Sequence, residues 1–363
     1  MDNKTLLFIF GTRPEFLKLI PIIQKARHLK KNIITCHTGQ HQETIEPLFK
    51  YFDFSPTFHF PSPKTPLSLS ELSSKIMVSL DKEKKALLNA DIAIIQGDTH
   101  SAFIGALWSF YNKIPVAHIE AGLRTFCLNE PFPEEGNRQL ISRIATLHFC
   151  PTENDVRHLK KEGITQDVYC VGNTIIDTVT HLAKKEGQKK ENRLLVTCHR
   201  RENFGKNFKN ICSALNTLCN QNPTIEILFI SHPNPNIMAQ APLLLTHPNI
   251  QILPAQNYIE VISLIQKSML VLTDSGGIQE EAPSLNTPVL ILRNKTERYA
   301  GLEAGTAKLI GTNSHTIVKE TELLLQNKEL YASMIEKKNP FGDGKSAEKI
   351  MAHITHSLSK TLS

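Results

Sequence analysis

Short apolar runs of strand length recur along the chain, separated by intervals long enough to hold a helix. They occupy residues 6–10, 33–38, 92–96, 116–119, 147–149 and 168–171, and then residues 194–197, 225–231, 250–253, 270–273 and 289–292. The runs do not alternate strictly between apolar and polar positions, which is typical of strands buried on both faces of a parallel sheet. Between them, Phe16, Leu19, Ile20 and Ile23 follow the spacing of one helix face, directly after Pro14 at a helix-opening position.

This alternation of strands and helices predicts an α/β fold with right-handed crossovers. A polar interval rich in Lys and Glu, between residues 177 and 192, separates the two series of strands. At roughly 100–200 residues per domain, 363 residues correspond to about two domains. We therefore predict two Rossmann-like doubly wound domains facing a central cleft. No apolar run approaches the roughly 20 residues of a membrane helix, so no membrane partner is expected.

The charge and the cysteine content limit which binding partners and which cellular compartment we expect. Lys and Arg number 41 against 35 Asp and Glu, and this net charge of +6 suits an anionic ligand. No dense basic cluster is interleaved with aromatic residues, so nucleic acid is not expected as a partner. The seven cysteines form no CxxC pair, and the first residues lack a signal-peptide pattern. Both features indicate a cytoplasmic protein with reduced thiols.

Polar residues gather directly after the predicted strands, at the edge where open α/β sheets bind ligands. Residues 11–18 (GTRPEFLK) join a glycine turn to a helix start, where backbone N–H groups, Arg13 and Lys18 can meet an anion. The stretch is neither a P-loop nor a GxGxxG motif. A tight turn with a surface arginine is the alternative interpretation.

Three carboxylates occupy similar positions in the first domain. Asp98 follows the run at 92–96, Glu120 follows the run at 116–119, and Glu134 opens a predicted helix after a proline-rich loop. A carboxylate at the end of a buried strand is unfavourable unless it is paired or functional, so acid–base chemistry is one interpretation. The alternatives are a helix N-cap for Asp98, an ion pair with Arg124 for Glu120 and the helix dipole for Glu134.

The second domain offers basic and glycine-rich strand ends. His199 is followed by Arg200 and Arg201, and His232 follows the run at 225–231. Residues 274–277 (DSGG) form a strand–turn–helix junction whose N–H groups could cradle a phosphate. The alternatives are solvated basic loops and a plain turn with a serine cap. The residues thus indicate a nucleotide sugar held at its diphosphate, with acid–base chemistry near the sugar.

Metal and covalent chemistry are not indicated. His37 and His41 are spaced i, i+4 but belong to no HExxH motif. Cys198 adjoins His199, yet neighbours on a strand point to opposite faces. GxSxG is absent as well. We therefore expect neither a metal ion nor a cysteine nucleophile.

The ordered set of these motifs resembles the non-hydrolysing UDP-N-acetylglucosamine (UDP-GlcNAc) 2-epimerases. The resemblance covers about residues 6 to 312. The matching stretches are residues 11–15 (GTRPE), 38–43 (TGQHQE), 96–99 (QGDT), 118–124 (HIEAGLR), 133–138 (PEEGNR), 172–177 (GNTIID), 199–203 (HRREN), 272–284 (LTDSGGIQEEAPS) and 296–298 (TER). It implies the GT-B architecture, with domains at residues 1–177 and 178–345 and a C-terminal helix at 346–363 that joins the first domain. It also implies a homodimer.

The implied reaction interconverts UDP-GlcNAc and UDP-N-acetylmannosamine (UDP-ManNAc) without NAD or an essential metal. UDP is eliminated to give 2-acetamidoglucal and then adds back. The matching catalytic positions are Asp98, Glu120, Glu134 and His199; which carboxylate removes the C2 proton stays open. The matching substrate contacts are Arg13, Lys18, Arg138, Gln256, Val261, Ser275, Gly276, Gly277, Glu281 and Arg298.

The chain departs from the family pattern at several positions. Val261 stands where the family often has an aromatic residue, a loss for which Tyr258 can compensate. Some bacterial members bind a second UDP-GlcNAc as activator, and the candidate second-site residues here are Gln40, Glu43, Arg200 and His232. Lys75 replaces the arginine expected at that second site and lacks its bidentate fork. We therefore expect weakened substrate activation, which a clearly sigmoidal rate curve would contradict.

The sequence alone leaves several other activities as alternatives. The nearest alternatives are a 2-epimerase of a related UDP-sugar, such as a diacetamido-uronate or a 6-deoxy sugar, and a hydrolysing 2-epimerase that releases ManNAc and UDP. A GT-B glycosyltransferase would need an acceptor, and three acids around one sugar argue against it. A non-catalytic nucleotide-sugar binding protein would not need those acids and His199 together.

Overall fold

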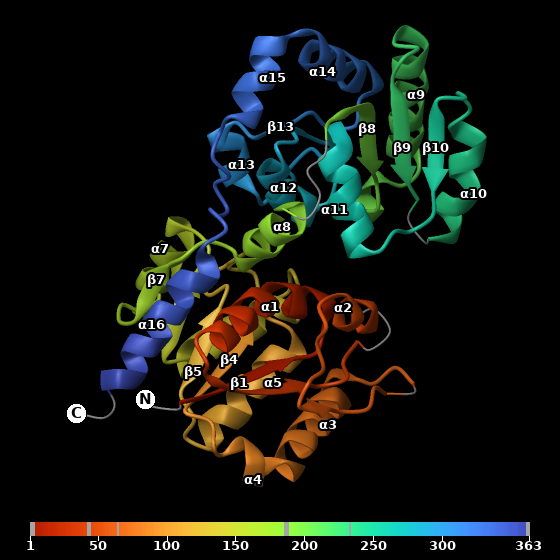
Figure 1. Cartoon of the computed structure of the whole chain (residues 1–363). Coiled ribbons are helices and arrows are strands. Elements are labelled where there is room, and N and C mark those ends of the chain that lie inside the picture. Colours follow the sequence, from red (N-terminus) through yellow and green to blue (C-terminus); the bar gives the residue numbers. More distant parts are fainter. Residues whose placement is uncertain (1–3, 42–44, 64, 185–188, 232–233, 361–363) are drawn as a thin grey trace. The chain divides into compact units, whose positions relative to one another are not determined.

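In a computed structural model, the chain divides into two compact units (Figure 1). The structure describes residues 4–41, 45–63, 65–184, 189–231 and 234–360. Unit 1 comprises residues 1–178 and 344–363, and unit 2 comprises residues 179–343. The chain therefore leaves unit 1 once and returns to it with its last helix.

Unit 1 is built on a seven-stranded parallel sheet with the order β3-β2-β1-β4-β5-β6-β7. Its strands are β1 (Thr5–Phe10), β2 (Asn32–His37), β3 (Phe58–His59), β4 (Ile92–Gln96), β5 (Val116–Ile119), β6 (Leu147–Cys150) and β7 (Val168–Cys170). Successive strands run outward in one direction from β1 and in the other from β4. The order therefore reverses between β1 and β4, the point where doubly wound sheets bind ligands.

Helices connect these strands, and two further helices follow the last of them. They are α1 (Arg13–His28), α2 (Glu46–Tyr51), α3 (Leu69–Lys82), α4 (Lys84–Leu87), α5 (His100–Tyr111), α6 (Glu134–Ile144), α7 (Glu153–Lys161), α8 (Thr174–Lys184), which runs on into unit 2, and α16 (Ser346–Lys360). The C-terminal helix α16 packs against α1. Its first two backbone N–H groups, from Ser346 and Ala347, donate to the Asp177 carboxylate. One buried aspartate therefore anchors the start of α16 to α8.

Unit 2 repeats this plan with a six-stranded parallel sheet of order β10-β9-β8-β11-β12-β13. Its strands are β8 (Glu191–Thr197), β9 (Glu226–Ile230), β10 (Ile250–Leu253), β11 (Ser268–Thr273), β12 (Val289–Ile291) and β13 (Ala307–Leu309). Its other elements are η1 (Arg201–Asn203), α9 (Lys206–Gln221), α10 (Pro235–Leu244), α11 (Tyr258–Lys267), α12 (Gly276–Glu281), η2 (Ala282–Leu285), α13 (Tyr299–Ala304), α14 (Ser314–Gln326) and α15 (Lys328–Ile335). The order here reverses between β8 and β11.

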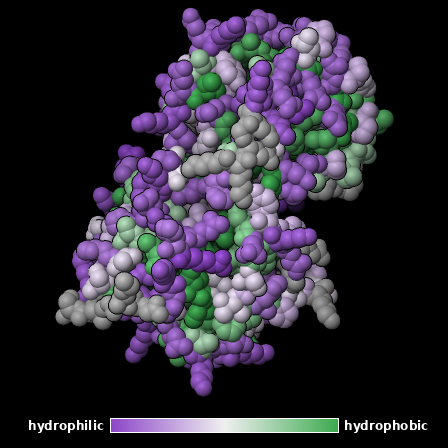
Figure 2. Space-filling model, viewed as in Figure 1, coloured by the Kyte–Doolittle hydropathy of each residue, from purple (hydrophilic) through white to green (hydrophobic). Residues whose placement is uncertain are grey.

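The strands are buried on both faces, as the lack of strict alternation predicted. In β1, Leu7 and Ile9 join one core cluster, whereas Phe10 packs against Phe16 of α1 with ring centroids 5.6 Å apart. Polar residues cover most of the face shown in Figure 2. The predicted class, two doubly wound α/β domains, is confirmed. Two short strands, β3 and β13, were not predicted, because runs of two and three residues give no periodic signal.

Candidate active site

The loops after β1 and β4 lie at the order reversal of the unit 1 sheet and are joined by one buried carboxylate. Glu15 is fully buried, and its Oε2 accepts the backbone N–H groups of Gly11 (3.0 Å) and Thr12 (2.8 Å). Its Oε1 accepts the hydroxyl of Thr99 at 2.7 Å, directly after Asp98. Burial raises the pKa of Glu15 to about 7 despite these donors. Glu15 therefore links the loop that carries Arg13 to the loop that carries Asp98.

Asp98 is paired with Arg138 of α6 through a short ion pair. The Asn137 side chain also donates to the Asp98 carbonyl oxygen at 2.9 Å, so α6 is fixed to this loop at two points. Burial raises the pKa of Asp98, and the nearby Glu120 acts in the same direction, while Arg138 and Lys18 oppose the shift. The cap of α5 is Thr99, whose hydroxyl accepts the N–H of Ala102, so Asp98 is not used as a helix cap.

Glu120 follows β5 directly and lies close to Lys18 and Gln96. Lys18 forms an ion pair with Glu120 Oε2, and Gln96 Nε2 donates to the same oxygen at 2.8 Å. Arg124 instead clamps Glu162 through Nε and Nη2, at 2.6 and 2.9 Å, so the alternative pairing of Glu120 with Arg124 is wrong. The structure thus brings Lys18, Asp98, Glu120 and Arg138 together at one edge of the unit 1 sheet.

The two carboxylates at the start of α6 have different environments. Glu135 is fully buried and accepts the backbone N–H groups of Thr125 (2.9 Å) and Phe126 (3.2 Å), which fixes the preceding loop. Glu134 is half-buried and is the first residue of the helix. Burial lowers the pKa of His100, which follows the Asp98 loop, and the charge of the nearby Glu134 opposes this shift. Glu135 is therefore committed to contacts within the chain, and Glu134 stays the candidate acid of this pair.

The turn after β1 requires glycine because other side chains approach it closely. A Cβ on Gly11 would lie 2.1 Å from the hydroxyl oxygens of both Ser101 and Thr38. Those hydroxyls are hydrogen-bonded to each other at 2.7 Å. Gln40 joins the cluster, because its Oε1 accepts the Ser101 hydroxyl at 2.6 Å. Arg13 is exposed at the start of α1.

In unit 2, the corresponding loops after β8 and β11 are joined by Asp274. This carboxylate is fully buried and accepts the backbone N–H groups of His199 and Arg200, at 3.0 and 2.9 Å on Oδ2. Asn203 Nδ2 donates to the same oxygen at 2.9 Å. His199 Nδ1 lies 3.4 Å from Asp274 Oδ1. The buried carboxylate thus fixes both the loop that carries His199 and the ring itself.

The Ser-Gly-Gly turn opens α12 without a side-chain cap. Ser275 is the N-cap residue with an extended backbone, and its side chain makes no capping hydrogen bond, so the serine-capped turn offered as the alternative is wrong. A Cβ on Gly276 would lie 3.4 Å from Cζ of Arg298, which places the guanidinium beside the turn. Glu281 follows at the end of α12. Its Oε1 accepts the hydroxyl of Tyr258 at 3.1 Å, so Tyr258 of α11 also belongs to this group.

Carboxylates hold the arginines near this turn in place. Glu297 pairs with Arg200 (3.1 Å), Arg293 (2.8 Å) and Arg298 (3.2 Å). Glu280 Oε1 accepts Nε of Arg298 at 2.8 Å. The candidate substrate contact Arg298 and the candidate second-site residue Arg200 thus share one ion-pair network beside the turn.

The remaining candidate residues lie apart from these contacts or outside the described residues. Gln256 donates to the carbonyl oxygen of Pro254 at 2.9 Å, and Val261 is partly buried in α11. Lys75 of α3 donates to the carbonyl oxygen of Pro61. Glu43 and His232 fall outside the residues that the structure describes.

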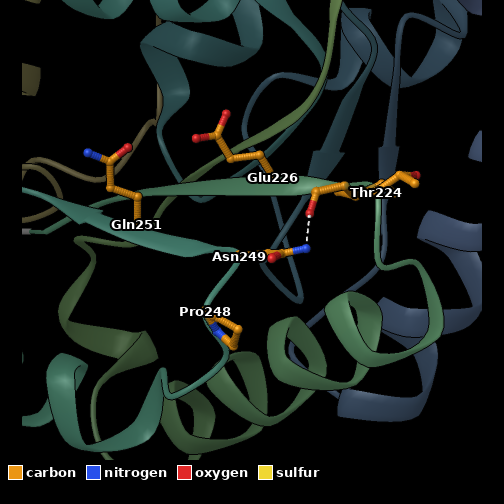
Figure 3. A pocket seen from close by; sticks show the side chains of 6 residues that line it. Thr224, Glu226, Pro248, Asn249 and Gln251 are labelled. Atoms are coloured by element: carbon orange, nitrogen blue, oxygen red, sulfur yellow. Dashed lines mark hydrogen bonds between the residues drawn. The ribbon is translucent and has the colours of Figure 1, made fainter.

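Among the residues that the structure describes, neither a metal cluster nor a membrane helix is found. Within the described residues, no group of three or more His, Cys, Asp or Glu side chains could hold a metal ion. None of the described helices is both long and apolar enough to cross a membrane. A hollow of about 360 Å³ lies at the amino ends of β9 and β10, lined by residues 224–226, 248, 249 and 251 (Figure 3). It contains none of the candidate residues and lies at the opposite edge of the sheet from His199.

Three residues that hold the candidate site together were not singled out from the sequence. Gln96, Glu15 and Asp274 lie within quoted motifs, but only the structure shows that each bonds to a candidate residue or to its loop. Two signals pointed to them. Gln96 and Asp274 end or directly follow a buried strand, and Glu15 stands three residues after Thr12, which makes a capping box.

The fold and the two strand-end clusters define the class of protein. Two doubly wound sheets, each with polar residues gathered after its strands, are typical of α/β proteins that bind ligands at the carboxyl ends of their strands. The family model for UDP-N-acetylglucosamine 2-epimerase matches residues 23–355. The chain therefore belongs to the UDP-N-acetylglucosamine 2-epimerase family.

Individual relatives agree with this assignment over nearly the whole chain. A UDP-N-acetylglucosamine 2-epimerase from Campylobacter jejuni is 38% identical over 96% of this chain and 96% of that protein. The crystal structure of a Listeria monocytogenes homologue has a TM-score of 0.91 at 34% identity, covering 99% of this chain and 98% of that one. The UDP-GlcNAc 2-epimerase from Neisseria meningitidis, bound to UDP-GlcNAc, has a TM-score of 0.84 at 36% identity and covers 97% and 100%. The GT-B class of fold is thereby confirmed.

Proposed function

We propose that the protein interconverts UDP-GlcNAc and UDP-ManNAc by inverting C2, and that it does so without releasing the sugar. The observation that carries the proposal is the pair Asp98 and Glu120 at the order reversal of the unit 1 sheet. Each has its own cation, Arg138 and Lys18 respectively. Two acids near one sugar allow proton removal and proton return on opposite faces of C2.

In the proposed mechanism, a carboxylate of unit 1 removes the proton from C2 while the C1–O bond to UDP breaks. The electron pair of the C–H bond forms the C1–C2 double bond of 2-acetamidoglucal. A second carboxyl group then returns a proton to the other face of C2, and a phosphate oxygen of UDP re-forms the bond to C1. Asp98, Glu120 and Glu134 supply these groups. No cofactor takes part, because neither a hydride nor an electron leaves the substrate.

We assign the leaving group to unit 2. His199 and the Ser275-Gly276-Gly277 turn meet the diphosphate, with Arg298 beside the turn, and Glu281 takes the ribose hydroxyls. Preorganised donors of this kind stabilise the charge that develops on UDP as it leaves. The buried Asp274 supports this role, since it holds the His199 loop before any ligand binds.

The proposal also covers location. All seven cysteines are free thiols, five of them buried, which supports a reducing compartment such as the cytoplasm, where disulfides are rare.

Product analysis tests the proposed function. Incubation with UDP-GlcNAc, followed by 31P NMR and anion-exchange chromatography, is expected to give a stable mixture of UDP-GlcNAc and UDP-ManNAc. Accumulation of free ManNAc and UDP would instead identify a hydrolysing enzyme. An unchanged substrate would favour another UDP-sugar, a glycosyltransferase or a binding protein, and would contradict the proposal.

A further inference from the structure

Two donors converge on a single oxygen of Glu120. Gln96 is the last residue of β4, is only 3% exposed, and donates through Nε2 to Glu120 Oε2 at 2.8 Å. Lys18 pairs with that same oxygen. Within the described part of the chain, no donor reaches Oε1 of Glu120. The two oxygens of this carboxylate therefore have different environments.

The backbone of Glu120 is held in an uncommon conformation. Its φ is +66°, in the left-handed region that non-glycine residues seldom adopt. The residues on each side are tied to neighbouring strands: Ile119 O accepts the N–H of Gly97 at 2.9 Å, and Ala121 N donates to Phe149 O at 3.0 Å. Such a conformation persists where the surroundings determine it, and it is common at functional sites.

This conformation explains why Gln96 can reach Glu120. Gln96 is in register with Ile119 across the β4–β5 pair. In a regular strand, the residue after Ile119 would point to the opposite face of the sheet from Gln96. The left-handed backbone at Glu120 redirects the side chain, and the 2.8 Å hydrogen bond from Gln96 is the result. Backbone and amide thus jointly set the direction of the carboxylate.

We propose that Gln96 is a positioning residue that holds Glu120 Oε2, so that Oε1 is the oxygen directed at the sugar. The inference rests on the proposed function, because it assigns the role of a group that supports one of the reacting acids. Gln96 orients Glu120 without adding charge, whereas Lys18 adds a cation. Loss of Gln96 alone is therefore expected to misplace the carboxylate while the charges around it stay the same.

The kinetic test compares Gln96→Met with Gln139→Met. Both changes remove a side-chain amide that donates to a glutamate at 2.8 Å, but Gln139 serves Glu135. Glu135 keeps its two backbone donors and stays fixed. We expect kcat to fall about 10- to 100-fold in Gln96→Met with KM within about threefold, the pattern of a misplaced reacting group. Gln139→Met should retain kcat within about threefold.

Either of two kinetic results would overturn the inference: a kcat within threefold of wild type in Gln96→Met, or an equal loss in Gln139→Met. Gln96→Asn is the second variant. It keeps the amide but shortens its reach by one methylene, so the same loss of kcat is expected. Wild-type turnover of UDP-GlcNAc tests the proposed function by itself, and the ratio of variant to wild type tests the role of Gln96.

A crystal structure of Gln96→Met gives a readout that does not depend on the substrate. We expect the Glu120 carboxylate to rotate away from its wild-type orientation or to occupy two conformers, while the backbone of residues 119–121 stays in place. A carboxylate that keeps its wild-type orientation without the amide would overturn the inference whatever the activity.

Discussion

Asp274 Oδ1 lies 3.4 Å from Nδ1 of His199, and the carboxylate is fully buried while the imidazole is partly exposed. The same carboxylate accepts the backbone N–H groups of His199 and Arg200. A buried acid therefore sets both the position of the ring and the course of the loop. This arrangement fixes which ring nitrogen faces Asp274 and directs the other nitrogen away from it.

Asp274→Asn is expected to loosen the loop that carries His199. An amide has one acceptor oxygen. If that oxygen replaces Oδ2, which accepts most of the donors, the NH2 group at the Oδ1 position faces the backbone N–H of His199, which lies 3.1 Å from Oδ1. We expect UDP affinity to fall about tenfold or more and unit 2 to lose on the order of 3 kcal/mol of stability. Isothermal titration calorimetry with UDP and thermal unfolding check both effects. Unchanged UDP affinity would remove Asp274 from the support of the site.

Asp98→Asn is expected to reduce turnover by about 10²- to 10⁴-fold, the usual contribution of one acid–base group. UDP should still bind, because the proposed UDP contacts are in unit 2. The matched control is Asp91→Asn, which removes a carboxylate that pairs with Lys4 at 2.9 Å, before the start of β4. Near-normal turnover in Asp98→Asn, measured by NMR, would remove Asp98 from the chemistry.

Gly11→Ala is expected to destabilise unit 1 by about 1–3 kcal/mol, the usual effect of overpacking. The new methyl group would lie 2.1 Å from two hydroxyl oxygens that are bonded to each other, so it must displace them. Gly136→Ala is the control, because nothing lies within 4 Å of its Cβ position inside α6. That change should stabilise the helix by about 0.5–1 kcal/mol. Equal unfolding midpoints for both variants would contradict the close approach at Gly11.

Glu15 is expected to make stability depend on pH. Burial raises its pKa from 4.5 to about 7, so the folded chain binds more protons than the unfolded chain between these values. Stability from this group therefore falls as pH rises from about 4.5 to about 7, by about 3 kcal/mol at 1.36 kcal/mol per unit of pKa. Glu15→Gln should remove this pH dependence, because an amide does not titrate in this range. The amide also fits the site, since its oxygen can face Gly11 and Thr12 and its NH2 can face Thr99.

Thermal unfolding of wild type and Glu15→Gln between pH 4 and pH 8 measures this effect. The wild-type midpoint should decline relative to the variant as pH rises. Midpoints that run parallel across this range would contradict the raised pKa of Glu15 in the folded chain. The comparison cancels the opposite effect of His118 and His37, whose pKa values burial lowers to about 3 and about 4.

Much of the fold was readable from the sequence because buried parallel strands give continuous apolar runs. All eleven predicted runs coincide with strands, with ends differing by up to three residues. β3 and β13 were not predicted, because they are too short to show a pattern of apolar residues. The candidate acids were readable because they follow strands directly. The pairing of each acid with its partner could not be predicted, because the partners are distant in sequence. Arg138 lies 40 residues from Asp98, and Lys18 and Gln96 lie 102 and 24 residues from Glu120.

Contacts that depend on backbone conformation could not be predicted from the sequence either. Nothing in residues 116–124 signals that Glu120 adopts a positive φ, since this conformation arises from hydrogen bonds to two neighbouring strands. The same holds for Asp274, whose role depends on the approach of the β8 and β11 strand ends. The homodimer and the second nucleotide-sugar site stay predictions.

The central claim is that carboxylates act on C2 while UDP leaves and returns. Solvent deuterium exchange tests it most directly: the protein is incubated with UDP-GlcNAc in D2O and followed by 1H NMR. We predict that UDP-ManNAc appears with deuterium at C2 and that the remaining UDP-GlcNAc gradually gains it as well. UDP-ManNAc that retains its original hydrogen at C2 would contradict the account.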